Sequence, residues 1–210
     1  MFVRVTWTDG SPDRWQAVTE EARQSMLQEL RSQPGWVATA LLADRQTGAD
    51  MTVGYWESQE ALQASEPGHA DRLRRLEARG ARVQEIERVE IVHLERSAPP
   101  QEHTFVRVND LRGTPTTLEE AIAFVREQVA PLLKRQKGFR ALIVGVNLDN
   151  GRSLVSSIWD SAADREARDA ALIELRRQGA QIAGAEQTKV ELYEVLALVE
   201  KSQGARAGQH

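Results

Sequence analysis

The 210-residue sequence contains no cysteine, and it lacks the features that membrane and secreted proteins require. Without cysteine the chain forms no disulfide and offers no thiolate to a metal or a substrate. No run of about 18 apolar residues is present to span a bilayer, and the N-terminus shows no hydrophobic signal core. We therefore expect a cytoplasmic protein that has no membrane partner and buries its own core.

Histidine and clustered positive charge are also scarce. There are four histidines, and the formal net charge is -4. Binding to nucleic acid depends on clustered lysine and arginine, so we expect no nucleic-acid partner. No two histidines have the i, i+4 spacing of a helical metal site, so we expect no metal. Glycine-rich nucleotide loops and the nucleophile-elbow motif of hydrolases are absent as well.

The sequence does contain an internal repeat. Residues 2–5 (FVRV) recur as residues 105–108, an offset of 103, and the same offset relates Trp56 to Trp159. Because the matches keep their order over nearly the full length, they indicate a duplication. The prediction is a first domain over residues 1–97, a linker over 98–102, a second domain over 103–199 and a flexible tail over 200–210.

Each copy changes its hydrophobic period in the order of a βαββαβ unit. In the first copy the pattern predicts a strand, a helix, two strands, a helix and a strand at residues 2–7, 11–30, 36–43, 51–56, from about 58, and 89–94. Helices then cover one face of a four-stranded antiparallel sheet, as in the ferredoxin-like split βαβ unit.

The other face of each predicted sheet is apolar and needs a partner, and the nearest partner is the other copy. We therefore predict an α+β fold in which two ferredoxin-like βαββαβ repeats pack sheet to sheet with their helices outside. This arrangement is an intramolecular pseudo-dimer that resembles a β-barrel, and we expect the chain to be a monomer or to form a higher oligomer through surfaces other than the sheet faces.

The residues around the third predicted strand resemble a known family. They are Pro34-Gly35-Trp36, Gly48, Tyr55-Trp56-Glu57-Ser58-Gln59-Glu60-Ala61-Leu62 and, in the second copy, Gly138-Phe139 and Trp159-Asp160-Ser161. In this combination the chain is similar to the antibiotic biosynthesis monooxygenase (ABM) domain of the dimeric α+β barrel superfamily. The resemblance implies a dimeric α+β barrel, here within one chain, and activities that range from cofactor-free monooxygenases to haem-degrading enzymes.

Resemblance to the cofactor-free monooxygenases implies a site built around Trp56. Their pattern places an asparagine four residues before this tryptophan, a tyrosine six residues after it and an arginine further along the second helix. These positions hold Thr52, Leu62 and, if a short gap is allowed, Arg74. The resemblance thus implies Trp56 and Arg74 as catalytic residues that need no cofactor, and Trp159 as the counterpart of Trp56 in the second copy.

Two kinds of residue at these sites admit two interpretations each. Trp56 and Trp159 are either the aromatic wall of a substrate pocket or core residues that fill the end of the sheet. Arg4 and Arg107 interrupt apolar strands, so each either holds a phenolate or carboxylate or forms an ion pair. The acidic partners considered for that pair are Glu90 and Glu191.

Histidine positions fit haem degradation less well. The family's histidine ligand falls on Arg75, and His69 lies six residues earlier. His69 and His93 are also candidate general bases, with a solvated or hydrogen-bonded role as the alternative for both. The arginine runs at 72–75 and 176–177 are interleaved with acidic residues and are interpreted as solvated helix faces.

The sequence as a whole favours a cofactor-independent, monooxygenase-like protein that acts on a small hydrophobic, aromatic or polyketide-type molecule. The expected substrate-binding residues are Trp56, Thr52, Leu62, Arg4, His69 and Trp159. Two alternatives stay open: a non-catalytic small-molecule-binding or scaffold protein, and a haem-binding or haem-degrading protein.

Overall fold

The computed structural model describes residues 1–9, 27–78, 80–113, 115–167 and 170–201. Its strands form one closed antiparallel barrel in the order β1-β3-β2-β8-β5-β7-β6-β4. They are β1 (Phe2–Asp9), β2 (Trp36–Ala43), β3 (Ala49–Trp56), β4 (Arg82–Arg96), β5 (Phe105–Arg112), β6 (Phe139–Asn147), β7 (Arg152–Trp159) and β8 (Glu186–Glu200). The fold is therefore a mixed α+β fold built on an eight-stranded antiparallel sheet.

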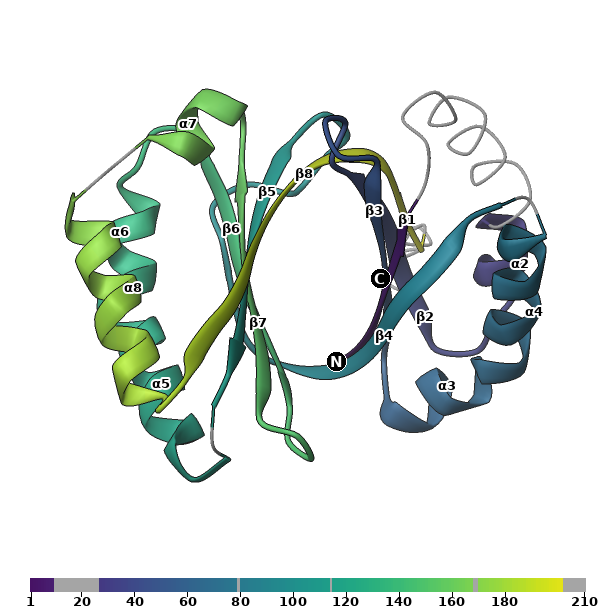
Figure 1. Ribbon diagram of the computed structural model, residues 1–210, viewed down its shortest axis with the longest axis horizontal. Coiled ribbons are helices and arrows are strands. Elements are labelled where there is room, and N and C mark those ends of the chain that lie inside the picture. The colour runs from purple at the N-terminus through teal and green to yellow at the C-terminus, as the bar shows by residue number, and fades with distance from the viewer. Residues whose placement is uncertain (10–26, 79, 114, 168–169, 202–210) are drawn as a thin grey trace, which may run out of the picture.

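Two groups of helices lie outside the barrel on opposite sides (Figure 1). One group is α2 (Leu27–Arg31), α3 (Gln59–Ala64) and α4 (Glu66–Glu77). The other is α5 (Leu118–Phe124), α6 (Ala130–Lys134), α7 (Ala162–Glu166) and α8 (Ala170–Ile182), with a 3₁₀ turn at Pro115–Thr117 and a π-helical turn at Val125–Val129. No helix in the described ranges is long and apolar enough to cross a membrane.

Local sequence accounts for where several of these helices begin. The hydroxyls of Ser58 and Ser161 accept hydrogen bonds from the backbone of Ala61 and Asp164, and so cap the first turns of α3 and α7. The helix predicted from residue 11 lies mostly outside the described residues, because the structure describes only its last part, α2.

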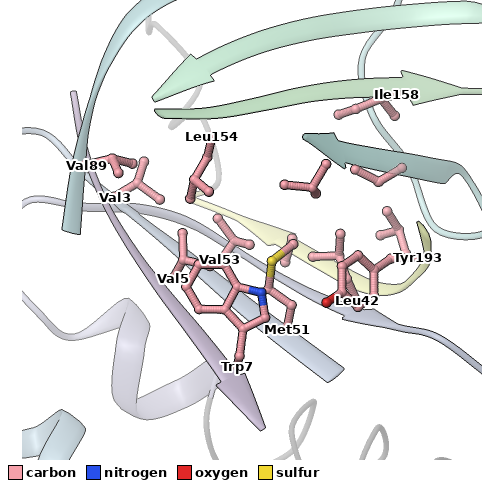
Figure 2. Close-up of a cluster of buried hydrophobic side chains, with 14 of the residues drawn as sticks. Val3, Val5, Trp7, Leu42, Met51, Val53, Val89, Leu154, Ile158 and Tyr193 are labelled. Carbon is pink, nitrogen blue, oxygen red and sulfur yellow. The ribbon is translucent and has the colours of Figure 1, made fainter. Parts of the chain in front are cut away.

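Side-chain alternation along the strands separates an apolar lumen from the helix-facing surface of the sheet. On β1, Val3 and Val5 point into the lumen, whereas Arg4 and Thr6 contact α3 and α4. Strands of both halves supply the lumen cluster (Figure 2), which includes Val3, Val5, Trp7, Leu42, Met51, Val53, Val89, Val106, Val108, Leu154, Ile158 and Tyr193.

The last strand of each half is longer than the sequence pattern predicts. β4 has 15 residues because residues 82–90 pair with β1 and residues 90–96 continue along β6 of the other half. β8 likewise pairs with β5 and then with β2. These two strands close the sheet into a ring. Hydrophobic alternation alone does not identify the strand of the other half with which each of them pairs.

A buried ion-pair cluster lies where strands of the two halves meet in the lumen. The guanidinium of Arg152 on β7 donates to Asp110 on β5 at 2.7 Å and lies 3.3 Å from Glu87 on β4. It also pairs with Glu85 and lies 4.9 Å from the centre of the Trp7 ring. We call these five residues the lumen ion cluster, because they fill this end of the barrel.

Candidate functional site

Trp56 lies at the end of β3, between the sheet and the helices of the first half. Its side chain is only 2% exposed and packs against Leu30, Trp36 and Leu62. The ring lies directly over Gly54, where an added methyl group would overlap it. Trp56 is therefore part of a packed core in this structure, and Leu62 reaches it as an apolar neighbour.

Arg4 joins this core from the adjacent strand, with its guanidinium 4.8 Å from the centre of the Trp56 ring. Nη2 of Arg4 donates to the Leu62 carbonyl at 3.0 Å and to Ser65 Oγ at 2.7 Å. The same nitrogen lies 3.0 Å from Glu66 Oε1 at the start of α4. A buried cation is thus held against an aromatic face.

The ion pair expected of Arg4 is present, but Glu90 and Glu191 were the wrong partners. Because Arg4 faces the helices, its acid comes from α4, whereas Glu191 accepts a hydrogen bond from Trp7 on the lumen side. Nε and Nη1 of Arg4 are buried and have no hydrogen-bond partner among the described residues. Burial lowers the pKa of Arg4, with Glu66 opposing that effect.

His69 on α4 lies beside Arg4 on the same face of the sheet. Its Nε2 is 3.4 Å from Oγ1 of Thr6, which pairs in register with Thr52 on β3. Burial, together with the positive charges of Arg4 and Arg72, lowers the pKa of His69 to about 3. The imidazole is therefore neutral near pH 7 and can accept a proton or a hydrogen bond.

The arginine run on α4 is not a uniformly solvated face, contrary to the sequence-based interpretation. Arg72 shares a helix face with His69, is buried, and pairs with Glu29 at 3.0 Å. Arg74 points away: its side chain is 72% exposed and pairs with Asp71. The structure therefore does not bring Arg74 to Trp56, and Arg4 and Arg72 are the buried cations of this site.

Trp159 occupies the equivalent position in the second half with one chemical difference. Its Nε1 donates to Ser157 Oγ at 3.0 Å, and its ring meets Phe139 edge to face at 5.6 Å. Nε1 of Trp56 has no partner among the described residues, because glycine stands at position 54 where the second half has Ser157. The two tryptophans are equally buried, but only the indole N–H of Trp159 has a hydrogen-bond partner among the described residues.

The second half has an open cavity of about 580 Å³ between β5 and α8, lined by Arg107, Ile173 and Arg176 among others. We call it the arginine cavity. Within the described part of the chain neither Arg107 nor Arg176 pairs with a carboxylate, so the ion pair predicted for Arg107 is not observed there. Nε of Arg107 donates to Asn109 Oδ1 at 3.4 Å, whereas Arg177 pairs with Glu174.

Electrostatics in the arginine cavity favour an anion. Burial lowers the pKa of Arg107, as does the charge of Arg165. Burial likewise lowers the pKa of Arg176, and the charge of Arg107 adds to the effect. Arg176 is thus another exception to the expected solvated faces. Partly buried cations without counter-ions are costly, and a bound anion removes that cost.

The described residues show no cluster of metal ligands, and His69 is enclosed by its neighbours. They contain no group of three or more histidine, aspartate and glutamate side chains that could hold a metal ion. Nε2 of His69 faces Thr6 within a packed, doubly cationic environment, and His69 does not line the arginine cavity.

Sequence reasoning missed Ser65, Glu66, Arg72 and Arg176 as members of these sites. A signal existed for two of them: Ser65-Glu66-Pro67 has the composition of a helix start, which would have placed Glu66 in the first turn of α4. The two arginines gave none, because helix rotation against the sheet is not visible in the sequence.

Several solved structures have a similar fold, and some of them are described as monooxygenase-like. An anthrone oxidase-like protein superposes with a TM-score of 0.69 over 99% of this chain and 97% of that chain, at 18% identity. A heme-degrading enzyme from Listeria monocytogenes gives a TM-score of 0.52 over 93% of this chain and 99% of its own, at 8% identity. At these identities the likeness shows the fold alone.

At the sequence level the chain belongs to the family of the uncharacterized Mycobacterium tuberculosis protein Rv2558. The two are 30% identical over 199 residues, which cover 93% of this chain and 83% of the relative. A second uncharacterized protein from the same organism, Rv2557, is 24% identical over 139 residues, covering 66% of this chain and 62% of its own length. No family model matches the sequence.

Proposed function

We propose that the protein is a monooxygenase-like enzyme that oxidises a small aromatic substrate in its deprotonated form, without a bound cofactor. The observation that carries this proposal is the buried guanidinium of Arg4, which stacks on Trp56 and keeps two donor nitrogens, Nε and Nη1, without a partner among the described residues. Such donors are suited to a phenolate or enolate oxygen in a site with little water.

His69 supplies the proton acceptor in this proposal. Its pKa is low because burial and the charges of Arg4 and Arg72 disfavour the imidazolium. An anion held by Arg4 weakens that repulsion, which raises the pKa of His69 as the substrate loses its proton. Trp56 supplies the aromatic face on which the Arg4 guanidinium lies, and Thr6 contacts the imidazole from the sheet.

The reaction balances for a substrate whose activated CH₂ group lies between aromatic rings. The substrate carbanion reduces O₂, one oxygen atom is retained as a carbonyl and the other leaves as water: R₂CH₂ + O₂ gives R₂C=O + H₂O. The substrate supplies all four electrons, so the protein contributes the base, the anion-stabilising donor and the aromatic contact.

Oxygen uptake with a panel of anthrones and dihydroquinones tests this function. Turnover without added metal or flavin is expected, with one atom of ¹⁸O₂ found in the product. Trp56→Phe and Arg4→Gln should each reduce kcat/KM at least tenfold, while Arg126→Gln, at an exposed arginine paired with Glu127, should keep the wild-type value. Absence of oxidation across the panel, with the protein folded, contradicts the proposal.

A second candidate is reversible binding of an aromatic carboxylate or phenolate in the arginine cavity, without chemistry. Its supporting observation is the open 580 Å³ space beside Arg107 and Arg176. Calorimetry with benzoate and naphthoate should then show saturable binding that Arg107→Gln and Arg176→Gln abolish. The ligand should be recovered unchanged, and Arg126→Gln serves as a matched control because Arg126 pairs with Glu127 and does not line the cavity.

We infer also that the chain arose by duplication, with a first unit over residues 1–97, a linker over 98–102, a second unit over 103–199 and a tail from residue 200. In support, β1 to β4 and β5 to β8 follow in the same order, and Trp56 and Trp159 end equivalent strands. The two units form an intramolecular α+β barrel that is a monomer in solution in this proposal.

A further inference from the structure

The barrel lumen holds a cavity of about 150 Å³ that is separate from the sites described above. Its lining is predominantly apolar and comes from both halves, including Val5, Ala40 and Val53 from the first and Val108, Ile143 and Leu154 from the second. Several of these side chains converge in the close-up of the lumen (Figure 2). Arg4, His69 and Arg107 do not line this cavity.

One end of the lumen is filled and the other is open. The lumen ion cluster lies near the start of β4, where Glu85 and Glu87 meet Arg152. Leu94 lies nine positions beyond Glu85 on the same strand, or about 30 Å along an extended chain. Leu94 and Met1 line the cavity there and are 43% and 46% exposed, so this end forms a mouth; Arg96 and Glu200 also line the cavity.

Two hydroxyl groups project from the apolar lining. Tyr55 and Ser156 both line the cavity, and neither hydroxyl has a hydrogen-bond partner within the described ranges. Burial raises the pKa of Tyr55 to about 12, with Arg96 at the mouth opposing that effect, so the phenol stays protonated and can donate. Ligand pockets typically combine an apolar lining with a few such polar groups.

We propose that the lumen binds one small apolar molecule, about the size of a single aromatic ring, whose polar substituent accepts a hydrogen bond from Tyr55. The size follows from the volume: a dry, apolar protein cavity of about 150 Å³ is large enough to take up benzene or xenon. The ligand enters at the mouth formed by Met1 and Leu94, because the lumen ion cluster occupies the other end. This site operates whether or not the helix-facing sites catalyse oxidation.

Titration calorimetry of the full-length protein with toluene and p-cresol tests the proposal. Both should bind with a stoichiometry of one, and p-cresol should bind more tightly. Ala40→Leu fills the lumen and should weaken both at least tenfold. Tyr55→Phe should remove the preference for p-cresol while leaving toluene binding within twofold of wild type.

A mouth variant keeps the test decisive if Ala40→Leu fails to fold. Leu94→Glu places a charge at the entrance and should weaken toluene binding several-fold with an unchanged melting temperature. Leu148→Glu is the matched control, because Leu148 is 53% exposed and does not line the cavity. No saturable binding, or binding that Ala40→Leu and Leu94→Glu both leave intact, overturns the proposal; so does xenon that fails to shift the lumen valine methyl resonances.

Discussion

At the scale of single residues, the contact between Gly54 and Trp56 leads us to expect that Gly54→Ala destabilises the protein. Gly54→Ala adds a methyl group where the indole ring now lies, so either the ring or the strand must move. Overpacking of this kind costs about 1–3 kcal/mol. Urea denaturation should show that loss, whereas Gly179→Ala on α8, where the new methyl group meets Phe124 at an ordinary contact distance, should be neutral or stabilising.

The low pKa of His69 leads us to expect that the protein becomes less stable in acid. Its pKa is about 3 in the folded protein against 6.5 for an unperturbed histidine, so the unfolded chain binds the extra proton between these values. The free energy of unfolding therefore falls as the pH drops from 6.5 towards 3. His69→Gln cannot take up this proton and should flatten that slope, while Asp50, whose pKa burial raises to about 6, acts in the opposite direction.

Denaturation curves of wild type and His69→Gln at pH 4, 5, 6 and 7 provide the measurement. The difference between the two proteins should shrink or reverse at low pH. A constant difference across this range would mean that His69 does not titrate as its surroundings indicate. His93→Gln is a useful comparison, because burial lowers the pKa of His93 as well but without two arginines beside it.

At these positions the sequence indicates which face of the strand a side chain occupies, but not which residue it contacts. The two-residue period of β1 correctly puts Arg4 opposite Val3 and Val5, because alternation is a property of the strand itself. Choosing Glu66 over Glu90 as its partner requires the packing of α4 on the sheet, a long-range contact with no local signature. The burial of Arg72 and the exposure of Arg74 depend on the same packing.

Among the elements, the order of strands and helices follows from hydrophobic period, and the ends of β2 and β3 fall close to their predicted limits. The lengths of β4 and β8 do not follow from the hydrophobic period, because each strand also pairs with a strand of the other half. Glu85 and Glu87 near the start of β4 are polar and resemble solvent-exposed strand residues in the sequence, but closure of the barrel brings Arg152 of β7 to them across the lumen.

The lumen ion cluster joins strands of the two halves, so we expect its loss to destabilise the protein. Arg152→Met leaves Asp110 and Glu87 buried without their cation, and removal of one partner from a buried pair costs about 3–5 kcal/mol. Arg126→Met, at an exposed position, should change stability by no more than about 0.5 kcal/mol. Equal effects of the two substitutions in chemical denaturation would show that the cluster does not stabilise the contact between the halves.

For the whole molecule, closure of the sheet predicts how the halves behave when the chain is cut. A protease site inserted at residues 98–102 should allow cleavage without separation, because β4 remains paired with β6 and β2 with β8. Gel filtration and sedimentation should both report one particle with the mass of a single chain, 23.5 kDa, before and after cleavage. Separation of the fragments, or a dimer before cleavage, would contradict this expectation.

A ring of eight strands also has consequences for the kinetics of amide exchange. In an open four-stranded sheet the outermost strands lose their protons to solvent first, since one side of each has no neighbour. Here β2 and β6 each have hydrogen-bonded neighbours on both sides. Their amides should therefore exchange as slowly as those of β1 and β5, so that the barrel opens to deuterium as one cooperative unit.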